Sequence, residues 1–166
     1  MLAAVVFAAT PVGTAAATTP SSLGGPTAPS AGAGPFDGIY AWGAGASGCV
    51  KIQSNATLTF DCRGIQRNFL GSYVLIRFPS DAFQAVLQLS PGQDPRQGLQ
   101  WYVQETSKVP FVFRKGVIQG SETVTINPRT IIPDRYRSAW DLGLDDYPFQ
   151  SSGPRVVNAE ITITPI

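Results

Sequence analysis

The sequence predicts an all-β domain, built as an antiparallel β-sandwich. The clearest evidence is a period-two alternation of apolar and polar residues, which is typical of strands with one buried face. Val156–Thr164 and Leu99–Gln104 both show it. Turn-forming Gly, Pro, Asn and Asp residues separate such stretches, and no segment has a strong helical pattern. About nine strands are expected, and a closed β-barrel stays open as the alternative because it gives the same alternation.

Further strands are expected where β-branched and aromatic residues are concentrated. They are Tyr73–Phe78, Val109–Arg114 and Glu122–Asn127. Ser80–Ser90 alternates as a strand does, although its first residues could also cap a helix, and we favour the strand. Ile132–Leu142 has a proline at a possible helix start and aromatic residues at helical spacing, so a short helix and an irregular excursion both stay open.

The first part of the chain has a different composition. No charged side chain precedes Asp37. Leu2–Ala9 is an unbroken apolar run and Ala15–Ala17 offers a cleavage site, so residues 1–17 are typical of a signal peptide. Residues 18–35 are almost wholly Pro, Gly, Ser, Thr and Ala, which predicts a disordered linker before a β domain at 36–166. The expected location is secreted or in the cell envelope, and no membrane span is expected because the apolar run is too short.

The composition excludes several classes of function. The chain has 166 residues and a net charge of +1, whereas nucleic-acid-binding domains normally have a marked basic excess. It has no histidine, which excludes Ser-His-Asp and Cys-His mechanisms, and its two cysteines are too few for a metal-thiolate cluster. Gly43–Gly48 matches G-x-G-x-x-G, but a strand pattern follows where dinucleotide binding needs a helix, so a loop is expected. We therefore predict neither catalytic residues nor a cofactor.

Cys49 and Cys62 are predicted to form a disulfide within a β-hairpin. If Asn55 and Ala56 form a two-residue turn, counting outward places the two cysteines directly opposite each other. They then form a non-hydrogen-bonded pair, in which facing side chains are closest. The tripeptide from Asn55 to Thr57 is also an N-glycosylation sequon, and it is explained either by glycosylation or by a turn that favours asparagine.

Residues 129–154 form the longest stretch with little strand pattern, and such loops often carry binding residues. Guanidinium groups beside aromatic rings can hold carboxylates, phosphates or sugars. The candidate binding residues are Arg129, Arg135, Tyr136, Arg137 and Trp140. Ion pairing with nearby aspartates is the alternative role of these arginines. Asp141, Asp145 and Asp146 are expected in a solvated acidic loop; three carboxylates this close could also bind calcium, but they do not match the EF-hand pattern and no metal site is predicted.

These observations favour a non-enzymatic binding or structural domain that engages a protein or glycan partner outside the cell or in the cell envelope. Binding would require an exposed patch of Trp, Tyr and Arg side chains. One alternative is a barrel that holds a small apolar ligand in a cavity lined by Trp42, Phe78, Trp101 and Phe113. A second alternative is a hydrolase in which two carboxylates face each other across a cleft.

Overall fold

The computed structural model describes residues 34–65, 73–94, 96–106, 111–147 and 156–166. These residues form ten β-strands and three short 3₁₀ helices, and no α-helix occurs among them. All of them belong to one unit, residues 33–166. The predicted export segment and most of the predicted linker lie outside the described residues.

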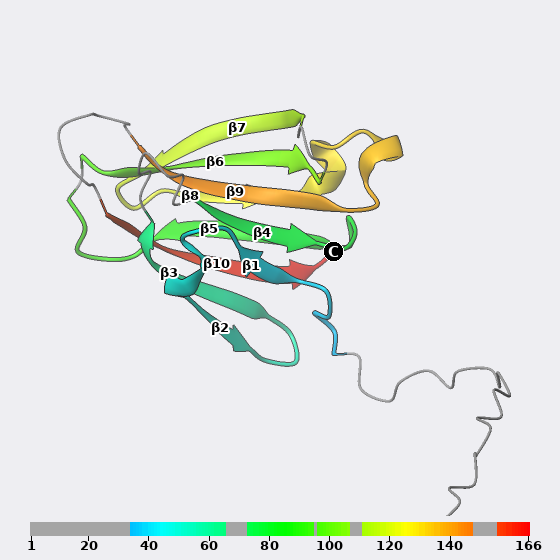
Figure 1. Ribbon diagram of the computed structural model, residues 1–166, viewed down its shortest axis with the longest axis horizontal. Helices are drawn as coiled ribbons and strands as arrows, with labels where there is room; N and C mark the ends of the chain where they lie inside the picture. Colours follow the sequence, from blue (N-terminus) through cyan, green and yellow to red (C-terminus); the bar gives the residue numbers. More distant parts are fainter. Residues whose placement is uncertain (1–33, 66–72, 95, 107–110, 148–155) are drawn as a thin grey trace, which may run out of the picture. The chain divides into compact units, whose positions relative to one another are not determined.

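The strands form two antiparallel sheets of five strands each. Sheet A contains, in spatial order, β1 (Tyr40–Trp42), β4 (Val74–Phe78), β9 (Trp140–Tyr147), β6 (Gly98–Glu105) and β7 (Val112–Gln119). Sheet B contains β2 (Cys49–Gln53), β3 (Leu58–Ile65), β10 (Val157–Pro165), β5 (Phe83–Leu89) and β8 (Thr123–Ile126). The connecting 3₁₀ helices are η1 (Ala46–Gly48), η2 (Pro128–Thr130) and η3 (Asp134–Tyr136). The sheets form the two layers of a sandwich (Figure 1).

The β-sandwich predicted from the sequence is confirmed, and the closed-barrel alternative is wrong. Each sheet keeps two free edges, β1 and β7 in sheet A and β2 and β8 in sheet B. Apolar side chains from the two inner faces fill the space between the layers, as in other aligned sheet packings. Phe78 and Trp101 belong to this core, whereas Trp42 is 37% exposed. The aromatic residues expected to line a ligand cavity are therefore not brought around one.

The predicted hairpin and disulfide are confirmed. The backbone N–H of Ser54 donates to the carbonyl of Thr57 at 2.8 Å, which closes the turn over Asn55 and Ala56. The side-chain oxygen of Ser54 accepts from the N–H of Thr57 at 3.0 Å. The register then pairs Cys49 with Cys62, and their sulfurs are bonded. Asn55 lies exposed at the tip, and its glycosylation stays a prediction.

Other elements follow the sequence less closely. Ser80–Ser90 contains the strand β5, as favoured. The strand expected at Val109–Arg114 begins at Val112 and continues to Gln119, so it extends five residues beyond the expected end and includes Gly116. The stretch after Ile132 forms the short helix η3 and then irregular backbone, until β9 begins at Trp140.

Strand β9 is the largest difference between the sequence prediction and the structure. The solvated acidic loop expected at residues 141–146 is wrong, because this segment is the central strand of sheet A between β4 and β6. Asp141, Asp145 and Asp146 are only 1%, 8% and 6% exposed. Trp140 belongs to the same strand, so the helical spacing of aromatic residues before it was misleading. Pairing with two neighbouring strands overrides that local pattern.

Candidate functional site

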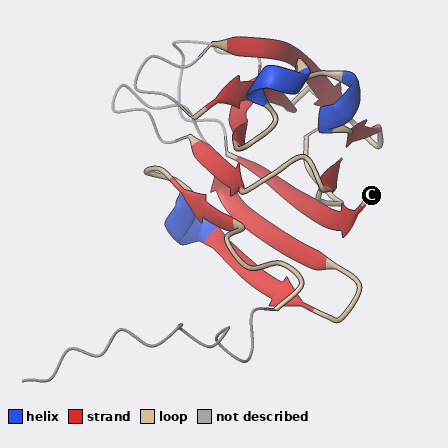
Figure 2. Cartoon of the chain, turned by 90° about the vertical axis from the view of Figure 1, so that its right-hand side faces the viewer, coloured by secondary structure: helices blue, strands red, loops and turns tan. Residues whose placement is uncertain are grey.

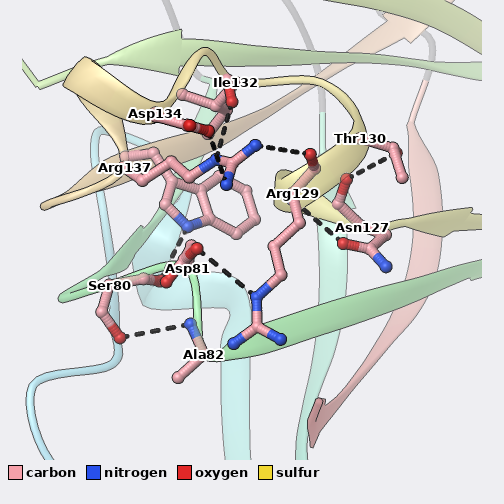
Figure 3. Close-up of polar contacts among 10 residues, drawn as sticks. Ser80, Asp81, Ala82, Asn127, Arg129, Thr130, Ile132, Asp134 and Arg137 are labelled. Atoms are coloured by element: carbon pink, nitrogen blue, oxygen red, sulfur yellow. Dashed lines mark hydrogen bonds and ion pairs between the residues drawn. The ribbon is translucent and has the colours of Figure 1, made fainter.

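The arginines predicted to bind a partner lie in and beside η2 and η3, which Figure 2 shows as helical turns outside the sheets. Arg137 connects these turns internally (Figure 3). Its Nε donates to the carbonyl of Ile132 at 2.9 Å, and its terminal nitrogens reach the carbonyl of Arg129 at 2.8 Å and the carboxylate of Asp134 at 2.7 Å. This guanidinium is engaged in holding the chain together, so its contacts support the alternative of intradomain pairing.

Arg129 and Arg135 make different contacts. Arg129 lies 3.4 Å from the carboxylate of Asp81, and its side chain is 47% exposed (Figure 3). The guanidinium of Arg135 lies 4.7 Å from the ring centre of Tyr136, which in turn packs on Phe113. Arg135 and Tyr136 thus form a small cation-π pair beside the core, and their role in binding stays a prediction.

Trp140 is separated from these residues because it lies inside the sandwich. Its side chain is fully buried, and its ring stacks on Phe78 with centroids 4.0 Å apart. The indole N–H donates to the carbonyl of Ser80 at 2.9 Å. A ring in this position stabilises the core, and a partner could reach it only after local unfolding.

The three aspartates considered for calcium do not share one face of β9. Asp141 and Asp145 occupy alternate positions that face away from the core, whereas Asp146 has the parity of Trp140 and Leu144. Among the described residues, no group of three or more acidic, histidine or cysteine side chains could hold a metal ion.

Strand register assembles a different set of side chains on the outer face of sheet A. One row across the five strands consists of Tyr40, Arg77, Asp141, Gln104 and Val112. The next row consists of Trp42, Leu75, Gly143, Tyr102 and Lys115. Asp145 and Gln100 face each other in the row after that. This face therefore carries three aromatic side chains together with arginine, lysine, carboxylates and amides.

The Arg77–Asp141 ion pair anchors one half of this face. Nε and a terminal nitrogen of Arg77 donate to the two carboxylate oxygens of Asp141 at 2.7 and 3.0 Å, a bidentate geometry. The hydrogen bond to Asp141 raises the pKa of the Arg77 guanidinium, so the group is charged at every ordinary pH. Its central carbon lies 5.4 Å from the ring centre of Trp42, a cation-π contact. Arg77 thus fills the space between a buried carboxylate and an exposed indole.

The Tyr102 ring covers the other half. It lies directly over Gly143 on the neighbouring strand, where a Cβ atom would come within 2.0 Å of two ring carbons. Only glycine leaves room for a ring this close to the backbone. Tyr102, Gln100, Val112, Lys115 and Asp145 line a shallow hollow of about 250 Å³ beside it. Trp42 and Tyr102 lie three strand spacings apart, or about 14 Å.

The sequence analysis did not predict this surface. The polar face of β6, with Gln100, Tyr102 and Gln104, was visible in the alternation. The residues beside that face could not be predicted, because the sequence predicts a loop where β9 lies. In addition, β1, β4, β9 and β6 are neighbours in the sheet but do not follow one another in the chain. A glycine opposite an aromatic residue is a signal of this arrangement only once the register is known.

Comparisons with known proteins show no family for this chain. No family model matches the chain, and no curated protein matches it. A solved structure described as "CBM4 structure and function" is similar with a TM-score of 0.37 and 6% identity, covering 77% of this chain and 86% of that one. Another, described as "Crystal structure of PirA", has a TM-score of 0.32 and 11% identity, covering 77% of this chain and 93% of that one. Within the described residues, no helix is both long and apolar enough to span a membrane.

Proposed function

We propose that the protein is an exported, non-enzymatic glycan-binding domain whose recognition surface is the outer face of sheet A. The observation that carries the proposal is that flat side chains, two aromatic rings and a guanidinium, lie on this face. The indole of Trp42, the guanidinium of Arg77 and the phenol of Tyr102 come from three different strands. The guanidinium lies against the indole, and the phenol covers the backbone of Gly143. Aromatic faces offer apolar surface to the C–H groups of a sugar ring, with little conformational entropy to lose on binding.

Polar groups beside the rings complete the chemistry of sugar recognition. Hydroxyl groups of a glycan both donate and accept hydrogen bonds, so a matching surface needs acceptors and donors together. Asp145 supplies carboxylate oxygens, Gln100 supplies both halves of an amide, and Lys115 supplies donors, all within one hollow. Such mixed, convergent polar groups next to an aromatic wall are typical of small-ligand sites.

Rigidity of the surface also supports binding as its role. Asp141 is buried and held by two hydrogen bonds to Arg77, so it contributes to the platform instead of standing free as a hydrolytic acid. Tyr102 lies against the central strand of the sheet. A surface fixed before binding loses less entropy when it meets its ligand. The Cys49–Cys62 disulfide and the apolar N-terminal run support export.

The test is affinity electrophoresis of the full chain through gels that contain one polysaccharide each. The panel covers neutral hexose polymers, uronate polymers and N-acetylated hexosamine polymers. At least one class should retard the protein, and Trp42→Ala and Tyr102→Ala should each weaken that retention about tenfold or more, as expected for aromatic residues central to an interface. Phe111→Ala is the matched control. Phe111 is also an exposed aromatic residue, at 65%, but its ring contacts Phe113 and it is not part of the rows of the outer face.

The proposal fails if no polysaccharide retards the wild-type protein, or if Phe111→Ala weakens binding as much as Trp42→Ala does. Capture of a protein partner that depends on Trp42 and Tyr102, without glycan binding, would also overturn it and assign the same face to protein recognition. Thermal unfolding of each variant shows whether lost binding reflects the face or the fold.

A further inference from the structure

The hollow beside Tyr102 combines groups that a plain hexose would not use fully. Its five lining residues come from three adjacent strands, β9, β6 and β7. Val112 is 42% exposed and presents methyl groups, whereas Asp145 is only 8% exposed. At about 250 Å³ the hollow is several times the ~30 Å³ share of one water molecule, so it accepts a substituent larger than a hydroxyl.

The register fixes how these groups are arranged. Asp145 pairs with Gln100, and Tyr102 pairs with Lys115, so the carboxylate and one amide lie in one row and the phenol and the ammonium in the next. Val112 is in register with Gln104 on the far side of the Tyr102 row. An acceptor, a mixed amide and a cationic donor thus surround a space that has an aromatic ring and an aliphatic side chain in its wall.

We infer that this hollow receives the acetamido group of an N-acetylated amino sugar, so that the glycan proposed above contains N-acetylhexosamine units. An acetamido group has one N–H donor, one carbonyl acceptor and one methyl group. Asp145 accepts from the N–H, Gln100 in the same row donates to the carbonyl, and the Tyr102 ring contacts the methyl. A carboxylate has lone pairs for about four hydrogen bonds, so Asp145 can accept this one in addition to its interaction within the domain.

Other sugar substituents fit these groups less well. A uronate would place a second negative charge beside the largely buried carboxylate of Asp145, and like charges in a desolvated site repel. A free hydroxyl would leave the Tyr102 ring beside Asp145 without an apolar contact. A free amine would be attracted to Asp145 but would be placed beside the ammonium of Lys115. The inference rests on the proposed function and names the class of glycan that the same face selects.

Isothermal titration of the full chain tests the inference with three oligosaccharides of equal length and linkage. They are β-1,4-linked N-acetylglucosamine, β-1,4-linked glucosamine and β-1,4-linked glucose. The N-acetylated oligomer should bind about tenfold or more tightly than the glucose oligomer, because a substituent that fills a matching pocket has roughly this effect. The glucosamine oligomer should not bind more tightly than the N-acetylated one.

Variants locate the preference in the hollow. Gln100→Ala should reduce the ratio of the two dissociation constants to a few-fold. Gln53→Ala is the matched control, because Gln53 is exposed on the edge strand β2 of sheet B, and it should leave the ratio unchanged.

Each outcome decides a separate point. Equal binding of the three oligomers, or a ratio that survives Gln100→Ala, overturns the acetamido assignment and leaves the glycan-binding face in place. Tightest binding of the glucosamine oligomer overturns it in favour of charge attraction to Asp145. If none of the polysaccharides in the electrophoresis panel binds, the proposed function and this inference fall together.

Discussion

Replacing Gly143 with alanine separates the binding face from the stability of the fold. Gly143 is not among the glycines with positive φ, so its backbone tolerates a side chain. The obstacle is the Tyr102 ring, which the new Cβ would approach within 2.0 Å. Tyr102 is only partly buried, so its ring can turn away towards solvent. The expected result is a domain that folds normally but has lost one wall of the hollow.

The expected change in the free energy of unfolding follows from two opposing contributions. Alanine restricts the unfolded chain and stabilises by about 0.4–1 kcal/mol at a compatible position. Displacing the ring costs a non-ideal rotamer, about 0.5–1.5 kcal/mol. The free energy of unfolding should therefore change by no more than about 1–2 kcal/mol. Glycan affinity should fall about tenfold, as for Tyr102→Ala, since the ring no longer faces the ligand.

Gly116→Ala is the control for Gly143→Ala, because it places a Cβ atom against an aromatic ring on the opposite, inner face of the same sheet. Gly116 lies opposite Trp101, and its Cβ would come within 2.5 Å of the indole. Trp101 is 6% exposed and packed between the sheets, so it cannot move aside. Overpacking of this kind costs about 1–3 kcal/mol. For a unit of about 130 residues this lowers Tm by roughly 3–12 °C, and binding at low temperature should survive.

The assay pairs calorimetric unfolding with glycan titration on both variants and on the double variant Gly143→Ala/Tyr102→Ala. The double variant should bind no worse than Tyr102→Ala alone, because both changes remove the same contact. The reasoning is refuted if Gly143→Ala leaves affinity unchanged, or if it destabilises the fold more than Gly116→Ala does.

Three further predictions concern stability. Replacing Cys49 and Cys62 by alanine opens a loop of about 14 residues and should cost about 3 kcal/mol, or roughly 10 °C in Tm by calorimetry; an unchanged Tm would contradict the entropic account. Asp141→Ala leaves Arg77, whose side chain is 27% exposed, without its carboxylate and should cost about 3 kcal/mol in urea unfolding; full stability would show that the pair does not hold the platform. Trp140→Ala empties part of the core and should cost about 3–5 kcal/mol, with loss of near-UV circular dichroism; a smaller cost would mean that the core collapses into the space.

The parts of the fold that depend on local sequence were predictable. The hairpin around Asn55 and the pairing of Cys49 with Cys62 depend on a turn of two residues and on counting outward from it. The period-two pattern of β10 also survives in the structure, because one face is buried and the other is not. β9 was not predictable in this way. It carries aspartates at positions that are buried by Arg77 and by neighbouring strands, and those neighbours are distant in sequence.

The candidate site was less predictable than the fold for the same reason. Arg129 and Arg137 drew attention because charged and aromatic residues are close together in sequence there, yet Arg137 mainly braces two turns. The rows of sheet A bring together residues from Tyr40 to Asp145, and only the strand order reveals them. Charged residues that are close in sequence tend to form ion pairs and hydrogen bonds with one another. A binding face, by contrast, is assembled by pairing between strands that are distant in sequence.

Strand β9 connects these observations, because it supplies both supports of the platform. Asp141 fixes Arg77 beneath Trp42, and Gly143 admits the ring of Tyr102. The two residues are separated by one position, so both lie on the outer face while the side chain of Leu142 between them faces the core. A shift of β9 by one residue would exchange the faces and remove both supports at once. Binding and folding are therefore coupled through the register of this one strand, more strongly than through any residue that would contact the ligand.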